Sequence, residues 1–422
     1  MSFNNLNLIP SILKAIKQEG YTEPTPIQLK AIPAILDNKD ILGCAQTGTG
    51  KTAAFSIPIL QMLFNREFMS RQNKTVQGLI ITPTRELAIQ IGKSIEVYGK
   101  FTGLHHAVVF GGISQNQQVI KLKKGVDIII ATPGRLLDLM NQGFINLDHI
   151  KYFVLDEADH MLDMGFIHDI NKIIEKLPAK RQTLFFSATM PKEIEKLADK
   201  ILTDPVKIAV TPVSSPVNII EQSLYKVAKV DKKRLLIHLL KDNTFKSILV
   251  FSRTKHGANK ITDDLAKIGI NVAAIHSNKS QTARQKALNG FKQKQIRVLV
   301  ATDIAARGID VDELSHVVNY DLPEVPETYI HRIGRTGRAG LSGTAISFCS
   351  EEDRKKLEEI EKLIDQSIHV VKNHPFVMDQ TSYKNNSKRR PNSGKKFFRS
   401  FSKMKNINKK RSFIKKTATV TY

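Results

Sequence analysis

Three carboxylates follow a short apolar run in the first half of the chain. Asp156, Glu157 and Asp159 flank Ala158, and they come directly after Tyr152–Leu155, a run that is typical of a buried strand. Side chains at the carboxyl end of a parallel strand are placed to meet a ligand. Carboxylates there can bind a divalent cation or accept a proton, although an acidic tetrad taken alone is more often a solvated turn.

An earlier polar segment has the composition of a phosphate-binding loop. Ile41–Cys44 predicts a strand, an apolar-periodic helix follows, and between them stand Ala45, Gln46, Thr47, Gly48, Thr49, Gly50, Lys51 and Thr52. Glycine backbone N–H groups can close around phosphate oxygens, Lys51 can reach the outer phosphates, and the Thr52 hydroxyl can bind Mg²⁺. Ala45 replaces the first glycine of the general pattern, but the flanking strand and helix favour a phosphate loop over an incidental turn.

Together the two segments predict a nucleotide triphosphatase in which Mg²⁺ bridges phosphates and protein carboxylates. We expect Asp156 to hold the metal through its inner water shell. Glu157 is expected to orient and deprotonate the attacking water. The predicted reaction is in-line transfer of a phosphoryl group to water.

The charge balance of the chain indicates a polyanionic partner. The 422 residues allow two or three domains, and 64 lysines and arginines against 40 acidic residues give a net charge of +24. No basic amphipathic helix stands out, so nucleic acid is favoured over a membrane. A basic protein that is merely soluble is the alternative.

The carboxyl-terminal segment carries much of this charge. From Thr381 to Tyr422 there are 14 lysines and arginines and no acidic residue, with Phe397, Phe398, Phe401 and Phe413 among them. Such a composition cannot bury a core and predicts disorder. Basic residues with interleaved aromatics predict salt-sensitive phosphate contact with some base stacking, and a purely solubilising tail is the alternative.

The cysteines and the hydropathy predict a cytoplasmic protein. Cys44 and Cys349 both lie in apolar, strand-like runs, without disulfide or metal-ligand spacing. No apolar run approaches the roughly 18 residues of a membrane span, and the amino terminus lacks a signal-peptide pattern. We therefore expect no membrane partner.

Short apolar strands alternate with helical segments in both halves of the chain, which predicts an α/β fold with mainly parallel sheets flanked by helices. The pattern breaks at a Pro/Ser stretch and then resumes without a second phosphate loop. The expected organisation is a first domain at 1–208, a linker at 209–218, a second domain at 219–372 and a basic tail at 373–422. The cleft between two such domains is a common ligand site.

Further polar segments follow the predicted strands in both halves. They are Pro83-Thr84-Arg85-Glu86-Leu87, Gly111-Gly112, Thr132-Pro133-Gly134-Arg135, Ser187-Ala188-Thr189, Val250-Phe251-Ser252-Arg253-Thr254, Gln281-Thr282-Ala283-Arg284, Ala301-Thr302-Asp303, Arg307-Gly308-Ile309-Asp310 and His331-Arg332-Ile333-Gly334-Arg335-Thr336-Gly337-Arg338. With the phosphate loop and the acidic tetrad, the set resembles the DEAD-box ATP-dependent RNA helicases of superfamily 2. The resemblance runs from about Phe3 to about Lys372 and is closest to the bacterial RhlE-like subgroup.

The resemblance implies two RecA-like domains and a site for ATP and Mg²⁺. Gly20–Gln28 is similar to the family's Q motif, in which Gln28 would hydrogen-bond the adenine edge and an aromatic ring, with Phe3 and Tyr21 as candidates, would stack on it. Gly308 and Asp310 would contact the nucleotide, Asp310 at the ribose. Without the family, Gln28 is only a polar residue early in a helix.

The resemblance also assigns residues to RNA and to coupling between the domains. Those that would grip the sugar-phosphate backbone of RNA are Pro83, Thr84, Arg85, Gly112, Thr132, Gly134, Arg135, Arg253, Thr254, Gln281, Arg284 and Thr302. Asp159, Ser187, Thr189 and His331 would link nucleotide state to closure. Arg335 and Arg338 would act as arginine fingers on the developing phosphoryl charge.

The implied function is RNA-stimulated ATP hydrolysis that locally unwinds short duplexes and remodels RNA–protein particles. Ribosomal particles or RNA-degradation proteins are the implied partners. Three alternatives stay open: an ATP-gated RNA clamp, a nucleic-acid annealing protein dominated by its tail, and a DNA helicase.

Overall fold

The computed structural model describes residues 2–45, 48–67, 75–209, 220–242, 244–306, 314–337 and 343–377. Several predicted features therefore lie outside the described residues: Gln46, Thr47, Gly308, Asp310, Arg338, nearly all of the linker, and the basic segment beyond residue 377.

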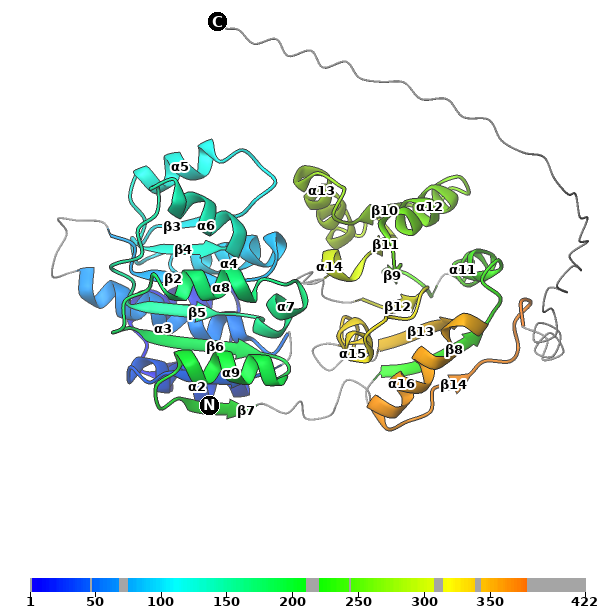
Figure 1. Cartoon of the computed structure of the whole chain (residues 1–422), viewed down its shortest axis with the longest axis horizontal. Coiled ribbons are helices and arrows are strands. Elements are labelled where there is room, and N and C mark those ends of the chain that lie inside the picture. The colour runs from blue at the N-terminus through cyan, green and yellow to red at the C-terminus, as the bar shows by residue number, and fades with distance from the viewer. Residues whose placement is uncertain are drawn as a thin grey trace, which may run out of the picture. The chain divides into compact units, whose positions relative to one another are not determined.

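The first sheet has seven parallel strands in the order β3-β4-β2-β5-β6-β1-β7 (Figure 1). Its strands are β1 (Ile41–Cys44), β2 (Gly78–Ile81), β3 (His106–Val109), β4 (Ile128–Ala131), β5 (Tyr152–Leu155), β6 (Gln182–Ser187) and β7 (Val206–Ala209). Its helices are η1 (Phe3–Leu6), α1 (Pro10–Gln18), α2 (Pro26–Leu36), α3 (Lys51–Glu67), α4 (Arg85–Tyr98), α5 (Asn116–Lys123), α6 (Pro133–Asn141), α7 (Ala158–Asp163), α8 (Ile167–Ile174) and α9 (Lys192–Ile201).

Helices cover both faces of the first sheet, so both faces are buried. Successive side chains of a strand point to opposite faces and therefore pack against different helices. On β5, Tyr152 and Val154 pack with α1 to α4, whereas Phe153 and Leu155 pack with α6 to α9. Helices on both faces explain why the central strands are apolar at nearly every position rather than at alternate ones.

The second sheet also has seven parallel strands, in the order β10-β11-β9-β12-β13-β8-β14. Its strands are β8 (Ile220–Lys226), β9 (Ile248–Phe251), β10 (Val272–Ile275), β11 (Val298–Ala301), β12 (His316–Asn319), β13 (Gly343–Cys349) and β14 (His369–Val370). Its helices are α11 (Lys232–Leu239), α12 (Lys255–Ala266), α13 (Gln281–Lys292), α14 (Asp303–Ala306), α15 (Pro326–Ile333), η2 (Glu351–Asp353) and α16 (Arg354–Ile364).

The two sheets share one topology, since the order of the second repeats that of the first strand for strand. This confirms the expected repetition of one architecture in both halves of the chain. Three strands were not predicted: β7, β8 and β14. Their side chains are partly exposed, so they lack the continuous apolar run by which a central parallel strand is recognised.

Arg332 is the largest fully buried side chain among the described residues, and it ties three elements of the second sheet together. Its Nη2 lies 2.8 Å from an oxygen of Asp303 on α14, and its Nε bonds the other oxygen of the same carboxylate. Its Nη1 donates to the Asn319 side chain and to the backbone oxygen of Asp321. A bidentate contact between an arginine and a carboxylate, like that of Arg332 with Asp303, is among the stronger ion pairs in proteins.

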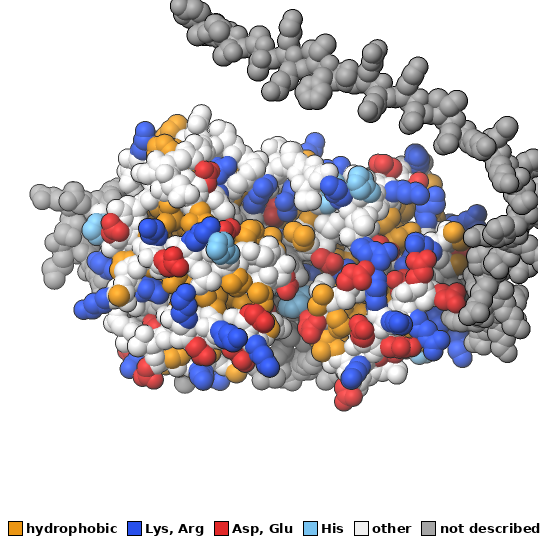
Figure 2. Space-filling model, viewed as in Figure 1, with side chains coloured by type: hydrophobic (Ala, Val, Ile, Leu, Met, Phe, Trp, Pro, Cys, Tyr) orange, Lys and Arg blue, Asp and Glu red, His pale blue; other side chains and the backbone are white. Residues whose placement is uncertain are grey.

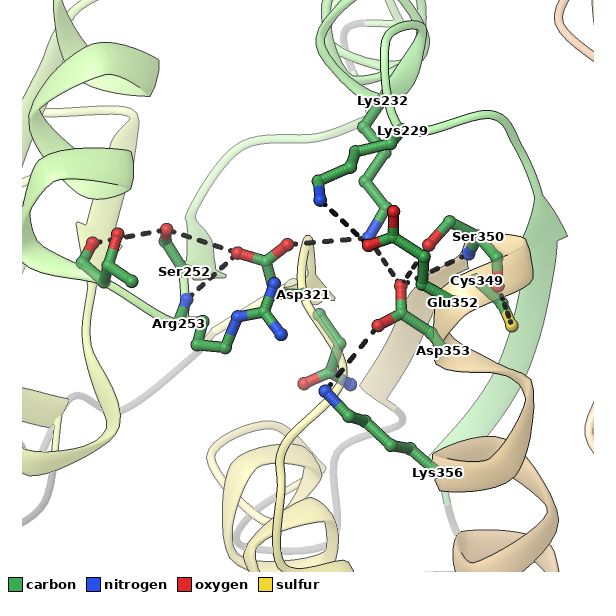
Figure 3. A network of polar contacts seen from close by, with 12 residues as sticks. Lys229, Lys232, Ser252, Arg253, Asp321, Cys349, Ser350, Glu352, Asp353 and Lys356 are labelled. Atoms are coloured by element: carbon green, nitrogen blue, oxygen red, sulfur yellow. Dashed lines mark hydrogen bonds and ion pairs between the residues drawn. The ribbon is translucent and has the colours of Figure 1, made fainter. Parts of the chain in front are cut away.

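Asp321 belongs to a second polar network, shown in Figure 3. The buried Lys232 on α11 points between Asp321 and Asp353, with its Nζ 3.5 Å and 3.0 Å from their carboxylate oxygens. The other Asp321 oxygen accepts a hydrogen bond from the backbone N–H of Arg253. The network therefore holds the turn that follows β9, where Arg253 is exposed.

The surface of the described region carries both signs of charge. Figure 2 shows Lys and Arg side chains interspersed with Asp and Glu on the visible face, rather than gathered in one basic field. In the described part of the chain, every helix is too short or too polar to cross a membrane.

The Arg332 contacts predict a large stability effect. Arg332→Leu should lower the free energy of unfolding by about 3 kcal/mol, because it leaves the Asp303 carboxylate and the Asn319 side chain without their cation. Urea unfolding of the full chain measures the change. The matched control is Arg354→Leu, whose ion pair with Glu358 is exposed on both sides, and which should cost less than about 1 kcal/mol. Equal effects of the two substitutions would contradict the assignment of Arg332 as an anchor.

Candidate active site

Three of the predicted motifs meet because their strands are neighbours. The phosphate loop follows β1, the acidic tetrad follows β5, and Ser187-Ala188-Thr189 follows β6, and the sheet order places β5, β6 and β1 side by side. Parallel strands end at one edge of the sheet, so these loops open at the same place. Residues more than a hundred positions apart in the sequence therefore share one site.

Lys51 begins α3 and is buried, with 6% of its surface exposed. Its Nζ donates to the backbone oxygen of Ala45 at 2.9 Å, across the start of the phosphate loop. Gly48 and Gly50 adopt the left-handed backbone region, with φ of 85° and 92°, which glycine enters without steric cost. This conformation turns the loop into the amino terminus of α3, a favourable place for phosphate oxygens.

Gln28 connects the predicted Q motif to the phosphate loop. Its Oε1 accepts a hydrogen bond from the Thr25 backbone N–H and completes a capping box at the start of α2. Its Nε2 donates to the backbone oxygen of Gly50 at 3.2 Å. The side chain is therefore held against the phosphate loop.

The two candidate adenine-stacking aromatics lie in different surroundings. Phe3 is buried in the core that packs on α1 to α4. Tyr21 is half exposed, and its ring centroid lies 6.2 Å from that of Tyr98. Of the two, Tyr21 is the ring with an accessible surface.

The carboxylates after β5 are buried beside one another, with exposures of 2% for Asp156, 3% for Glu157 and 5% for Asp159. Burial raises the pKa of Asp156 to about 6, against the lowering effect of Lys51. Burial alone would also raise the pKa of Glu157, but the nearby His160, followed by Lys51 and Arg335, lowers it to about 2. Glu157 is thus held as a carboxylate.

Asp159 connects the tetrad to Ser187-Ala188-Thr189. Its Oδ2 accepts hydrogen bonds from the backbone N–H groups of Ala188 and Thr189, at 3.2 and 2.8 Å, and from the Thr189 hydroxyl at 3.0 Å. The Ser187 hydroxyl accepts the Asp159 backbone N–H and donates to the backbone oxygen of Thr189. Burial would raise the pKa of Asp159, but His160, Lys51 and these donors lower it.

Two residues of the second sheet reach this cluster. The ring of His331, on α15, lies edge-on to His160 with centroids 4.9 Å apart. Arg335 is buried, and its charge contributes to the low pKa of Glu157. Asp159, His160 and His331 each place one potential metal-ligand atom within 4.8 Å of the others. Since the Asp159 carboxylate already accepts four hydrogen bonds, the geometry favours a hydrogen-bonded cluster over a metal site.

Most of the residues predicted to contact RNA stand at helix amino termini. Pro83 and Thr84 precede α4, Thr132 precedes α6, Thr254 precedes α12, and Thr302 precedes α14, while Arg85, Gly134, Arg135 and Arg253 lie within or beside these turns. The Thr84 and Thr254 hydroxyls cap their helices by accepting the Leu87 and Gly257 N–H groups. Such termini offer unpaired N–H groups to phosphates.

Gly112 and Arg85 form a close pair at the end of β3. Gly112 is exposed and has a φ of 79°, and a Cβ at this position would collide with the Arg85 guanidinium. The left-handed backbone conformation favours glycine here, whereas the flexible Arg85 side chain could move away from a Cβ.

Gln281 and Arg284, which were predicted to contact RNA, are buried and bind another side chain. Both are buried on α13 and bind Glu86 of α4: Arg284 Nη2 lies 2.8 Å and Gln281 Nε2 lies 3.0 Å from its two carboxylate oxygens. These contacts join an element of the second sheet to an element of the first, and both sheets belong to one compact unit.

Sequence reasoning missed Glu86, Arg332 and His160 as residues of this region. Glu86 lies inside the Pro83-Thr84-Arg85-Glu86-Leu87 segment, and Arg332 stands next to His331. Their positions in these segments could have suggested a role for both residues. His160 follows the tetrad directly, but its contact with Glu157 is visible only in the structure.

The chain has two parallel sheets of one topology. The first carries a phosphate loop and buried carboxylates, and the second contributes a buried arginine. This combination is typical of a helicase-type nucleoside triphosphatase. Residues 25–197 match the DEAD/DEAH box helicase family, and residues 231–340 match the helicase conserved C-terminal domain.

Individual relatives agree with these matches. ATP-dependent RNA helicase CshA of Limosilactobacillus reuteri is 43% identical over 363 residues, which cover 86% of this chain and 72% of that protein. DEAD-box ATP-dependent RNA helicase RhpA of Helicobacter pylori is 45% identical over 369 residues, covering 87% and 74%. S. cerevisiae Dbp5 bound to RNA and ADP BeF3 matches the fold with a TM-score of 0.78 at 34% identity, covering 88% of this chain and 95% of Dbp5.

The chain belongs to the DEAD-box ATP-dependent RNA helicases. The predicted family and the fold of two RecA-like domains are confirmed. The RhlE-like subgroup and the domain boundaries stay predictions.

The Asp159 contacts predict a pH-dependent stability. Asp159→Asn should lower the free energy of unfolding at pH 7 by about 2 kcal/mol, because either orientation of the amide turns its N–H₂ toward a backbone N–H. Since the folded pKa of Asp159 lies below its ordinary value of 3.8, the wild-type advantage should persist above that pH and shrink as the pH falls below it.

Urea unfolding of both chains at pH 7 and near pH 3.5 measures this difference. Thr189→Val is the matched control, because it removes one of the hydrogen bonds to Asp159 and should cost about 1 kcal/mol. A pH-independent difference between wild type and Asp159→Asn would count against an ionised Asp159.

Proposed function

We propose that this chain couples RNA binding to ATP hydrolysis and uses the cycle to separate short RNA duplexes locally. The observation that carries the proposal is the electrostatic setting of Glu157. This carboxylate is buried at the end of β5, close enough to Lys51 of the phosphate loop and to Arg335 of the second sheet for both charges to lower its pKa. A carboxylate that can act as a base, together with two cations that can stabilise phosphate charge, is the arrangement needed to transfer a phosphoryl group to water.

In the proposed reaction, Glu157 orients a water molecule in line with the outermost phosphate of ATP and accepts a proton from it. The water oxygen forms the new bond to phosphorus as the bond to the leaving ADP oxygen breaks. Lys51 binds the outer phosphates, and Arg335 with Arg338 stabilises the charge that develops on the transferring group. Because the arginines come from the other domain, hydrolysis requires both domains to be in contact.

Asp156 and Thr52 are the proposed holders of Mg²⁺. They offer a carboxylate and a hydroxyl, the oxygen ligands that this ion prefers, and the raised pKa of Asp156 indicates a buried carboxylate whose charge the protein compensates only in part. Such a residue fits a divalent cation. When bound, Mg²⁺ would neutralise phosphate charge during the transfer.

RNA is proposed to bind along the helix amino termini that follow β2, β4, β9 and β11, through its sugar-phosphate backbone and with little sequence preference. The match to Dbp5 solved with RNA and ADP BeF3 supports this assignment. In this proposal Gln281 and Arg284 act through Glu86, because their side chains bind it across the two sheets. The contact would favour the closed arrangement that RNA and ATP stabilise together.

We place the protein in the cytoplasm, where its tail tethers it to structured RNA, and we assign it to ribosome assembly or RNA turnover with the corresponding particles or degradation proteins as partners. The tail contains fourteen lysines and arginines after Thr381, whereas the visible face of the described region mixes both signs of charge (Figure 2).

Glu157→Gln should abolish most RNA-stimulated ATP hydrolysis, with a loss of roughly 10²-fold or more, because the amide cannot accept the proton. Binding of ATP and RNA should persist. The measurement is single-turnover hydrolysis together with strand separation on matched RNA and DNA duplexes. If the variant hydrolyses ATP at the wild-type rate, Glu157 is not the base. If wild type separates DNA as well as RNA, the assigned substrate is wrong, and hydrolysis without separation of either duplex would identify an RNA clamp.

A chain ending at residue 377 should bind RNA more weakly and with a smaller dependence on salt, because fewer counterions are released per complex. RNA affinity measured at several salt concentrations tests this. In the matched control, Phe397, Phe398, Phe401 and Phe413 are replaced by Leu in the full chain, which should keep the salt slope and reduce only the stacking contribution. An unchanged affinity and slope after truncation would refute the tether.

A further inference from the structure

His160 lies in direct contact with Glu157, although it belongs to none of the assigned motifs. It sits one turn into α7, three residues after Glu157, and only 1% of its surface is exposed. Its Nδ1 lies 2.9 Å from Glu157 Oε2, and both side chains are almost fully buried. A contact so well shielded from water is stronger than the same contact on a surface.

The contact constrains the orientation of the Glu157 carboxylate. Glu157 caps α7 with a φ of 56°, a left-handed conformation that is uncommon for a residue with a side chain. Asp156 Oδ1 accepts its backbone N–H at 3.1 Å. With the backbone held in this way and Oε2 bound to His160, rotation of the carboxylate is restricted.

His160 is itself held from two sides. Its backbone N–H donates to Asp159 Oδ1 at 3.0 Å, which ties it to the residue that binds Ser187 and Thr189. Its ring packs edge-on against His331 of the second sheet. Its Nε2 is buried without a hydrogen-bond partner within the described ranges. The ring therefore has one polar contact through its nitrogens, and that contact is with Glu157.

We infer that His160 is a positioning residue for ATP hydrolysis: its Nδ1–H donates to Glu157 Oε2 and holds the carboxylate in the orientation that lines up the attacking water. This inference rests on the proposed role of Glu157 as the base. His160 touches neither nucleotide nor water in this role, and it acts only through Glu157.

Three substitutions separate the hydrogen bond from the ring packing. His160→Asn keeps a donor near the place of Nδ1 but removes the ring, His160→Phe keeps a ring but removes the donor, and His160→Leu removes both. The rate constant of single-turnover ATP hydrolysis, with saturating RNA and full-length protein, is the readout because product release can hide a change in the chemical step.

The rate constant should fall about 10-fold in His160→Phe and His160→Leu, while His160→Asn should stay within about threefold of wild type. Affinities for ATP and RNA should not change in any of the three, and thermal unfolding identifies a variant that fails to fold. Should His160→Leu misfold, the comparison of Asn with Phe decides alone. A normal rate in His160→Phe would overturn the inference, as would a loss in His160→Asn equal to that in His160→Phe.

A double substitution tests whether His160 acts through Glu157. In a Glu157→Gln background, His160→Phe should cause no further loss, because the oriented base is already absent. A further 10-fold loss would show that His160 acts elsewhere and would overturn the inference. If Glu157→Gln alone keeps the wild-type rate, the proposed base is wrong. If instead Glu157→Gln is inactive but His160→Phe hydrolyses ATP at the normal rate, only the His160 inference fails.

Discussion

The burial of three carboxylates at the end of one strand is the constraint on which the rest of the site depends. A buried charge is costly unless it is paired or hydrogen-bonded, so each of these side chains needs its own compensation. Asp159 is compensated by the backbone of the loop after β6, and Glu157 by His160, Lys51 and Arg335, whereas Asp156 keeps a raised pKa that suits a cation. The three residues are chemically similar, but their pKa values shift in different directions because their surroundings differ.

The repeated topology explains how one chain assembles a site from distant segments. Each sheet places the ends of β5, β6 and β1, or of their counterparts β12, β13 and β8, next to one another. The first sheet uses that edge for the phosphate loop and the carboxylates. The second uses it to anchor Arg332, and with it the turn that carries Arg335, through Asp303, Asn319 and Asp321. One architecture thus places the proposed base, Glu157, in one half of the chain and the cation Arg335 in the other.

The central strands were predictable because strands buried on both faces are apolar at nearly every position. Ile41–Cys44 and Tyr152–Leu155 have the predicted bounds. β8 was missed because its polar and apolar residues alternate, and β7 because three of its four residues are exposed. The short β14 pairs with β8 through only two residues, which is too little for a periodicity to be seen.

The sequence by itself predicted the chemistry: a lysine and glycines for phosphates, carboxylates for a cation and a water, and arginines for a developing charge. These follow from residue types in order along the chain, which is information that a sequence contains. Only the tertiary structure decided the pairings, such as Glu157 with His160, Glu86 with Arg284, and Arg332 with Asp303. Partners in the last two pairs are far apart in sequence, so no local spacing rule predicts them. Glu157 and His160 are only three residues apart, but their burial and their distance of 2.9 Å are set by the fold.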